Sequence, residues 1–299
     1  MRHLETEMLA VLIAVADTRS FTAAAERLGK TQAAVSMCIS RTEERLQKRI
    51  FDRTRQGAIP TAVGQNLIAY ARRIVALEAE ALSAVSDSLS EARVRVGMAD
   101  DYLGLIGNLL LHKFAPRHRS IYIDLTCDFS TRLRMLVDQG QIDIALAVRQ
   151  FDAPAQGEVL FSHRQVWCTG PSGAPEAEEG LRLALFSDEC SARPRIMAAL
   201  ERHGRPWRLV HSSSHLAGLL MAVASGRMLT VLPECAVPEG WRIIEPRQAG
   251  LPELPVAYLT IVTPENQGLA ARKIAAFLRA EFAAQRDADA FIAFRDLSA

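Results

Sequence analysis

Two helical patterns joined by only two residues, Gly29 and Lys30, most strongly constrain the fold of this chain. The patterns cover residues 21–28 and 31–47, and helices joined so tightly must cross near the turn. Each helix begins after a hydroxyl side chain that can cap its first turn, Ser20 or Thr31. The inward positions are small or aliphatic and permit close approach: Ala24, Ala25, Leu28, Ala34 or Val35, Ile39 and Leu46. This stretch therefore predicts a helix-turn-helix.

An earlier helix and a later hairpin complete the predicted domain. A first helix should end near Thr18 and Arg19, and its apolar stripe consists of Leu4, Met8, Leu12 and Val15 or Ala16. Two short strands, residues 50–53 and 58–61, can pair around a turn at Gln56 and Gly57. The hairpin forms a wing that carries Arg53 and Arg55.

Basic side chains are concentrated in this region. The 299 residues carry a net charge of +1, whereas the window from Arg27 to Arg55 holds eight basic and three acidic residues and is +5. Such an excess is typical of a surface that binds DNA phosphates, although a solvated helix face carries the same charge. Short or flexible side chains at the start of the second helix suit base edges, and Lys30, Arg53 and Arg55 suit phosphates. The predicted DNA-binding residues are Lys30, Thr31, Gln32, Ala33, Ser36, Met37, Arg53 and Arg55.

Residues 1–64 resemble the winged helix-turn-helix domain of the LysR-type transcriptional regulators. The resemblance rests on residues in the family's order and spacing: Ser20, Phe21, Ala24, Ala25, Leu28, Gln32, Val35, Ser36, Ile39, Glu43, Leu46, Phe51, Arg53, Thr61 and Gly64. The chain departs from the family pattern at three positions, Thr42 in place of leucine, Gln47 in place of glycine, and Pro60. The resemblance implies sequence-specific binding of double-stranded DNA.

A long amphipathic helix is predicted directly after this domain. Between Val63 and Leu89 there is no proline, and Gly64 is the only glycine. Apolar residues recur three or four positions apart: Leu67, Tyr70 or Ala71, Ile74, Leu77, Ala81 and Val85. Packing within the same chain would also explain this stripe. In the resembled family the helix pairs two subunits, which implies a homodimer or a dimer of dimers and a two-fold operator.

From Arg93 onward, short apolar strands alternate with helical patterns. The predicted strands are residues 94–99, 121–126, 143–148, 164–170, 183–186, 208–213, 229–233 and 256–262. This order predicts parallel sheets covered on both faces and divided into two subdomains. We expect the chain to cross between them near 160–165 and to return near 263–267, with a last long helix over 267–284 on the first subdomain. Phe291, Ile292 and Phe294 suggest a further docked helix.

The predicted fold class is therefore multidomain, α+β followed by α/β. It comprises a winged helix-turn-helix (1–62), a dimerisation helix (63–90) and an effector-binding domain (91–299). That last domain resembles the periplasmic-binding-protein-like domain of the same family. Its first subdomain is predicted to take residues 91–162 and 266–299, and its second 163–265.

An effector site is expected between the two subdomains, because ligands of open α/β sheets bind outside the carboxyl ends of the strands. Six candidates follow strands of the first subdomain: Asp100, Asp101, Tyr102, Ser130, Thr131 and Arg149. Four come from the other subdomain, at a helix N-terminus whose free N–H groups can hold an anion: Ser212, Ser213, Ser214 and His215. Any of them can instead cap a helix or lie on the surface. The acidic pair disfavours a dianion, so an uncharged, amine-bearing or zwitterionic effector is expected.

Other function classes fit the sequence less well. The serines beside His211 and His215 invite comparison with a hydrolase, but the chain lacks a G-x-S-x-G elbow, a P-loop, an HExxH and a GxGxxG motif, so neither an enzyme nor a cofactor is expected. A periplasmic solute-binding protein is the alternative that the second half alone would fit. The five scattered cysteines predict reduced thiols and no metal site, with a redox pair as the other interpretation. With no signal or membrane segment, a cytoplasmic location is expected, and RNA polymerase is a further candidate partner.

Overall fold

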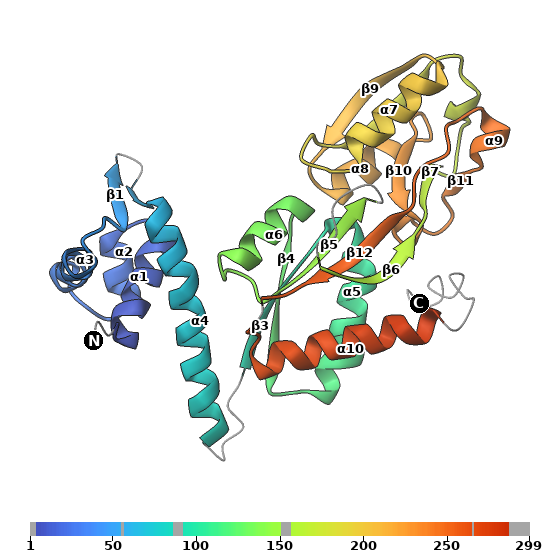
Figure 1. Cartoon of the computed structure of the whole chain (residues 1–299). Helices are drawn as coiled ribbons and strands as arrows, with labels where there is room; N and C mark the ends of the chain where they lie inside the picture. Colours follow the sequence, from blue (N-terminus) through green and yellow to red (C-terminus); the bar gives the residue numbers. More distant parts are fainter. Residues whose placement is uncertain (1–3, 55–56, 86–91, 151–156, 265, 287–299) are drawn as a thin grey trace. The chain divides into compact units, whose positions relative to one another are not determined.

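The computed structural model of the chain describes residues 4–54, 57–85, 92–150, 157–264 and 266–286. The chain divides into two compact units, one formed mainly by residues before 92 and the other mainly by residues after it. Figure 1 shows a small domain with one long helix in the first unit, and two groups of strands with their helices in the second.

The first unit contains the predicted helix-turn-helix and wing. Its elements are α1 (Thr6–Thr18), α2 (Phe21–Arg27), α3 (Gln32–Leu46), β1 (Phe51–Thr54), β2 (Gly57–Pro60) and α4 (Ala62–Val85). The two strands pair antiparallel, with Thr54 opposite Gly57. Each strand is displaced by one residue from its prediction, so Gly57 belongs to β2 and not to the turn. The winged fold is confirmed.

Both predicted caps are present at the helices of this domain. The Ser20 hydroxyl accepts from the Ala23 N–H at 3.3 Å, and the Thr31 hydroxyl accepts from the Ala34 N–H at 3.2 Å. Val35 is the inward residue of the two alternatives, because Ala34 is exposed. Mostly aliphatic side chains form the core: Leu9, Val11, Leu12, Ala14, Val15, Ala24, Ala25, Val35, Ile39, Ile50, Phe51, Ala58, Ile68 and Ala71.

Two departures from the family pattern have a clear structural basis. Thr42 is fully buried, and its hydroxyl donates to the Cys38 carbonyl at 2.7 Å, so the polar group is satisfied within its own helix. Gln47 ends α3 in the left-handed conformation, with φ 54° and ψ 35°. Glycine adopts this conformation without steric cost, which accounts for the glycine usual at this position.

Gln47→Gly is expected to stabilise the protein by about 0.5–1 kcal/mol, because it removes left-handed strain at the end of α3. The loss of the exposed bond from the Gln47 side chain to the Glu44 carbonyl limits the gain. Urea unfolding of the two proteins measures the difference. Gln47→Ala is the control, since alanine retains the strain and should give no gain.

The first sheet of the second unit has the strand order β4-β3-β5-β12-β6. Its strands are β3 (Ala92–Met98), β4 (Ile121–Cys127), β5 (Ile144–Gln150), β6 (Glu158–His163) and β12 (Ala257–Val262). Helices α5 (Leu103–Asn108), α6 (Ser130–Asp138) and α10 (Leu269–Arg286) accompany it, and α5 continues through a π-helical segment, Leu109–Phe114. Side chains of α5 and α10 share one apolar cluster with alternate residues of β3 and β5.

The second group of strands forms two small sheets. An antiparallel sheet has the order β10-β7-β11, with β7 (Gln165–Thr169), β10 (Thr230–Pro233) and β11 (Arg242–Ile244). A parallel pair joins β8 (Leu181–Phe186) to β9 (Trp207–Ser213). Helices α7 (Arg193–His203), α8 (Leu216–Val223) and α9 (Pro246–Ala249) complete this subdomain.

The structure corrects three predictions for this unit. The sheets are mixed and not parallel throughout, because β12 runs antiparallel to β5 and β6. Since β12 lies in the first sheet, the chain returns to that subdomain before Ala257, earlier than the predicted 263–267. Strands β6 and β11 were not predicted. The suggested helix around Phe291, Ile292 and Phe294 lies outside the described residues.

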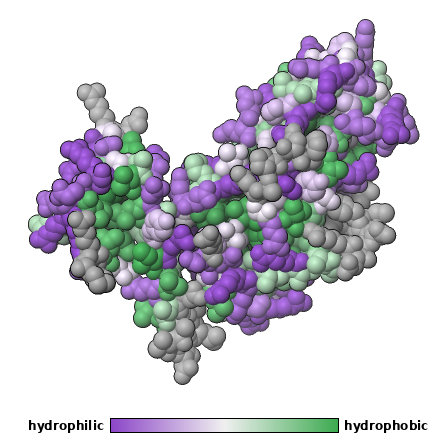
Figure 2. Space-filling model, in the orientation of Figure 1, coloured by the Kyte–Doolittle hydropathy of each residue, from purple (hydrophilic) through white to green (hydrophobic). Residues whose placement is uncertain are grey.

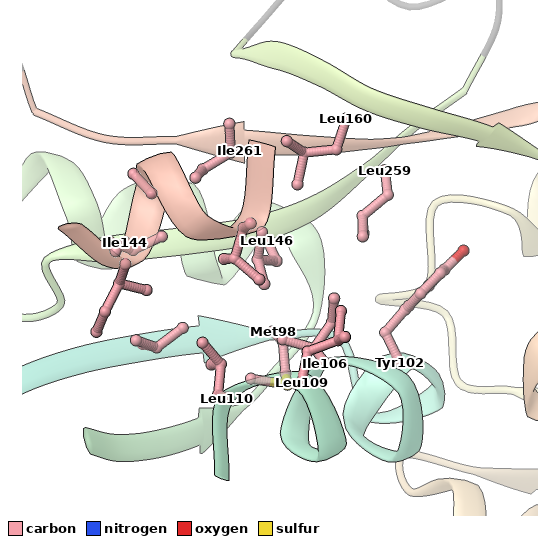
Figure 3. Close-up of a cluster of buried hydrophobic side chains, with 14 of the residues drawn as sticks. Met98, Tyr102, Ile106, Leu109, Leu110, Ile144, Leu146, Leu160, Leu259 and Ile261 are labelled. Carbon is pink, nitrogen blue, oxygen red and sulfur yellow. The ribbon is translucent and has the colours of Figure 1, made fainter. Parts of the chain in front are cut away.

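The largest core of the second unit lies between the first sheet and helices α5 and α10 (Figure 3). Tyr102 is fully buried at the edge of this cluster, and Figure 3 shows its hydroxyl turned away from the aliphatic side chains. That hydroxyl is hydrogen-bonded to Nε2 of His163, which is 3% exposed. Tyr102, predicted as an effector ligand, is therefore part of the core.

Candidate functional sites

The outer side of α3 presents the predicted DNA-binding residues. Gln32 and Ala33 are exposed, Met37 is 53% exposed, and Ser36 is half-buried. Figure 2 shows mostly hydrophilic residues on the side of this domain where α3 lies. Thr31 has the structural role of N-cap described above. Because the first turn of α3 carries short side chains, this end of the helix can approach a groove closely.

Two predicted phosphate ligands differ in their surroundings. Arg53 of the wing donates to the Ser36 hydroxyl at 3.0 Å, and its guanidinium lies 4.7 Å from the centre of the Phe21 ring. These contacts place the wing's cation directly beside α3. Lys30 is ion-paired with Glu7 of α1, and this pairing raises the pKa of the lysine. Arg55 lies outside the described residues.

Helix α4 carries two apolar stripes, where the sequence predicted one. Ile68 and Ala71 are buried against the core of the winged domain, and Leu67 packs beside them. A second stripe remains exposed within the described chain, including Val63, Tyr70, Ile74, Leu77, Ala81 and Leu82. Leu77 and Leu82 are 63% and 67% exposed. The side chain of Val85 lies outside the described residues.

A pocket of about 270 Å³ lies between the two subdomains of the second unit. It is lined by Ala99, Asp100, Asp101, Cys127, Asp128, Phe129, Ser130, Val148, Gln150, Gln165, Phe186, Glu189, Cys190, Ser191, Ala192, Ser214 and His215. Most of these residues follow the carboxyl ends of β3, β4, β8 and β9, as expected for a ligand site in an α/β domain.

Half of the predicted effector residues line this pocket: Asp100, Asp101, Ser130, Ser214 and His215. The other half do not: Tyr102, Thr131, Arg149, Ser212 and Ser213. Thr131 is exposed on α6, and the guanidinium of Arg149 lies 4.9 Å from the centre of the Tyr258 ring. The Ser212 hydroxyl accepts from Arg193 at 3.2 Å. Side chains alternate along a strand, so only part of each predicted strand end faces the pocket.

The two aspartates at the end of β3 differ in role. Asp100 accepts from the backbone N–H of Leu216 at 2.6 Å, so it caps α8 of the other subdomain. Burial, with a smaller contribution from the nearby charge of Asp100, raises the pKa of Asp101 to about 7. Asp101 therefore gains or loses its charge near neutral pH, as expected of a group in a ligand site.

Several pocket residues were missed by the sequence analysis. Asp128 follows β4, and Glu189 follows β8, so the rule applied to the other strands would have found both. Gln150 was missed because β5 was predicted to end two residues earlier. Gln165 lies at the start of β7, where no sequence signal indicates a ligand.

One member of the serine run, Ser213, has a structural role. The Ser213 hydroxyl donates to the carbonyl of His215 and accepts from its N–H, at 2.8 and 3.1 Å, so it caps a turn. All five cysteines are free, and burial raises the pKa of Cys168 and Cys235 to about 12, which disfavours the reactive thiolate. Within the described ranges, no cluster of metal-ligating side chains occurs, and no helix could cross a membrane.

The chain combines a winged helix-turn-helix with a second domain whose two subdomains enclose a pocket. This combination defines a class of ligand-responsive regulators. Residues 6–65 match the bacterial regulatory helix-turn-helix family of LysR type, and residues 88–283 match the LysR substrate binding domain. The chain belongs to the LysR family of transcriptional regulators.

Individual relatives agree with this membership. The chain is 30% identical to the transcriptional regulator DgdR of Burkholderia cepacia, over 87% of this chain and 88% of that protein. Among solved structures, full-length LysG from Corynebacterium glutamicum, with bound effector Arg, is similar with a TM-score of 0.63 and 19% identity, covering 93% and 99% of the chains. Full-length CbnR complexed with target DNA has a TM-score of 0.58 and 17% identity, with the same coverage.

Proposed function

We propose that this regulator binds duplex DNA with α3 in the major groove and Arg53 on the adjacent backbone. The observation that carries the proposal is the continuous surface formed by exposed residues of α3 and the wing, joined by the bond between Arg53 and Ser36. Gln32, Ala33, Ser36 and Met37 face base edges, and Lys30, Arg53 and Arg55 lie on phosphates. CbnR, which is similar in fold, was solved in complex with its target DNA, and this supports DNA as the partner proposed here.

The second apolar stripe of α4 is proposed to pair two chains as a homodimer. Exposure of these large apolar side chains to water is unfavourable. The first stripe already packs α4 against the core of its own winged domain, so the second stripe is free to contact another chain. A two-fold dimer would place two α3 helices in successive major grooves, about 34–36 Å apart or at multiples of that distance. A dimer of dimers would extend the same arrangement.

The pocket between the two subdomains is proposed to hold a small-molecule effector that changes how the dimer binds DNA. A ligand shifts such an equilibrium only if it binds one arrangement of the subdomains better than another. The pocket is suited to this because its residues come from both subdomains. The proposed function needs no catalytic step. Because it requires contact with genomic DNA, we propose that the protein acts in the cytoplasm. A solute-binding protein without a transcriptional role is not favoured, because the family match includes residues 6–65.

Arg53→Ala is expected to lower affinity for all duplexes and to reduce the slope of log affinity against log salt by about one unit. Gln32→Ala should instead redistribute preference among sequences, because it removes a base contact and no charge. Salt-dependent anisotropy titrations on selected and scrambled duplexes measure both effects. If Arg53→Ala lost affinity for only one duplex sequence, the result would contradict a contact between this residue and phosphate.

A further inference from the structure

Four carboxyl groups line the pocket, and they come from both subdomains. Asp100 and Asp101 enter from the first subdomain after β3, Asp128 after β4, and Glu189 from the second subdomain after β8. No lysine or arginine is among the described lining residues. An anionic ligand would meet no lysine or arginine among these lining residues, and the carboxylates would oppose its charge in a partly desolvated site.

The two helices that begin near the pocket also offer little to an anion. The first N–H of α8, from Leu216, is already bonded to Asp100. At α7 the N–H groups of Arg193 and Arg195 donate to the Cys190 and Ala192 carbonyls, and Pro194 between them has none. Anion binding at a helix start requires free N–H groups, so these positions do not provide it.

A neutral polar side chain in the pocket is left without a partner. Gln150 is 2% exposed, and neither its amide oxygen nor its amide nitrogen has a hydrogen-bond partner. Leaving both groups unpaired is costly in a buried position. Because Gln150 lines the same pocket as the four carboxylates, a bound molecule with a donor or acceptor would satisfy it.

We propose that the effector is a small organic cation, in which a protonated amine pairs with Asp101 and its acidic neighbours while a further polar group bonds to Gln150. The proposal rests on the proposed function and adds to it the chemical class of the ligand. Asp100 contributes one carboxylate oxygen while the other holds α8, so the amine lies where the two subdomains are already joined. Phe129 and Phe186 supply apolar walls for the carbon skeleton.

A pH dependence of binding follows from the ionisable groups in and around the pocket, above all Asp101. The ionisable groups that line the pocket with it are Asp100, Asp128, Glu189 and His215, and the weakly acidic groups that its charge affects are Tyr102, Cys127, Cys190 and Cys235. With a pKa of about 7, Asp101 is partly protonated at neutral pH, and a bound cation favours its charged form. Binding should therefore release protons near pH 7 and weaken as the pH falls to 6.

Three four-carbon probes test the charge of the ligand on the full-length protein: putrescine, butanediol and succinate. Butylamine and agmatine extend the amine set. Calorimetric titration should show binding by at least one amine, with no binding by the diol or the diacid. Asp101→Asn and Gln150→Leu should each weaken the binding of that amine by about tenfold or more. Glu201→Gln, an exposed acid on α7, is the matched control and should leave binding unchanged.

Binding of succinate in preference to every amine would overturn the proposal, as would amine binding that neither pocket variant weakens. Failure of all three amines would also overturn it. DNA binding, measured on the same samples, separates this failure from that of the proposed function. If specific DNA binding persists while the amines fail, only the ligand class is wrong. If DNA binding is absent, the proposed function is wrong.

Discussion

Asp101→Asn is expected to raise the free energy of unfolding at pH 8 by up to about 4 kcal/mol. The pKa of Asp101 rises from 3.8 to about 7 in the folded chain, because burial disfavours its charge. Between these two values the folded state holds a proton that the unfolded state has lost, so stability falls as pH rises. The cost of the charged form is fully present above pH 7, and it disappears below pH 4. Asparagine never has this charge.

Urea unfolding at pH 8 and pH 4 tests this prediction. The difference between Asp101→Asn and the wild type should be large at pH 8 and small at pH 4. Glu201→Gln should show no such dependence. An equal difference at both pH values, or a variant that is less stable at pH 8, would contradict a raised pKa of the carboxyl group at this position. If Asp101→Asn is more stable at pH 8 and also binds amines more weakly, then Asp101 lowers the stability of the protein while contributing to ligand binding.

The second large effect is expected from His163, which should make the protein acid-sensitive. Burial lowers the pKa of His163 from 6.5 to about 4, because a charged imidazole is disfavoured beside Tyr102 in the core. Between these values the unfolded state binds a proton that the folded state excludes. The contribution of the neutral ring to the free energy of unfolding is therefore fully present above pH 6.5. As the pH falls to 4, up to about 3 kcal/mol of it is lost.

His163→Gln removes this titration while retaining a hydrogen-bonding group for Tyr102. Relative to the variant, the wild type should lose about 3 kcal/mol of unfolding free energy between pH 7 and pH 4. Asp101 changes stability in the opposite direction over this range, so the comparison is made between proteins that share Asp101. Parallel pH curves for the wild type and His163→Gln would contradict a buried neutral histidine.

The sequence predicted the winged domain well because its signals are local. Ser20 and Thr31 cap helices that begin at the next residue, and a buried alanine pair in the first of these helices permits a close crossing. Likewise, the eight predicted strands of the second half all occur in the structure. Each is a short apolar run whose identity depends on its own residues.

Long-range pairing could not be predicted in the same way. Strand β12 is an apolar run like its neighbours, and nothing in its residues indicates that it pairs antiparallel with β5 and β6. The same limit affects the pocket. Tyr102 directly follows Asp101, yet a single turn sends its ring into the core while the aspartate lines the pocket. To predict Gln150 as a pocket residue, the true end of β5 must be known, and the local sequence pattern does not define it.

The chain is proposed to bind DNA as a two-fold assembly through α3. The most direct test recovers genomic fragments with the purified full-length protein and then measures the mass and footprint of each complex. We predict two or four chains per duplex, with paired protected segments centred about 34–36 Å apart or at multiples of that spacing. A protein that remains a single chain and enriches no fragment, even at low salt, would contradict the account.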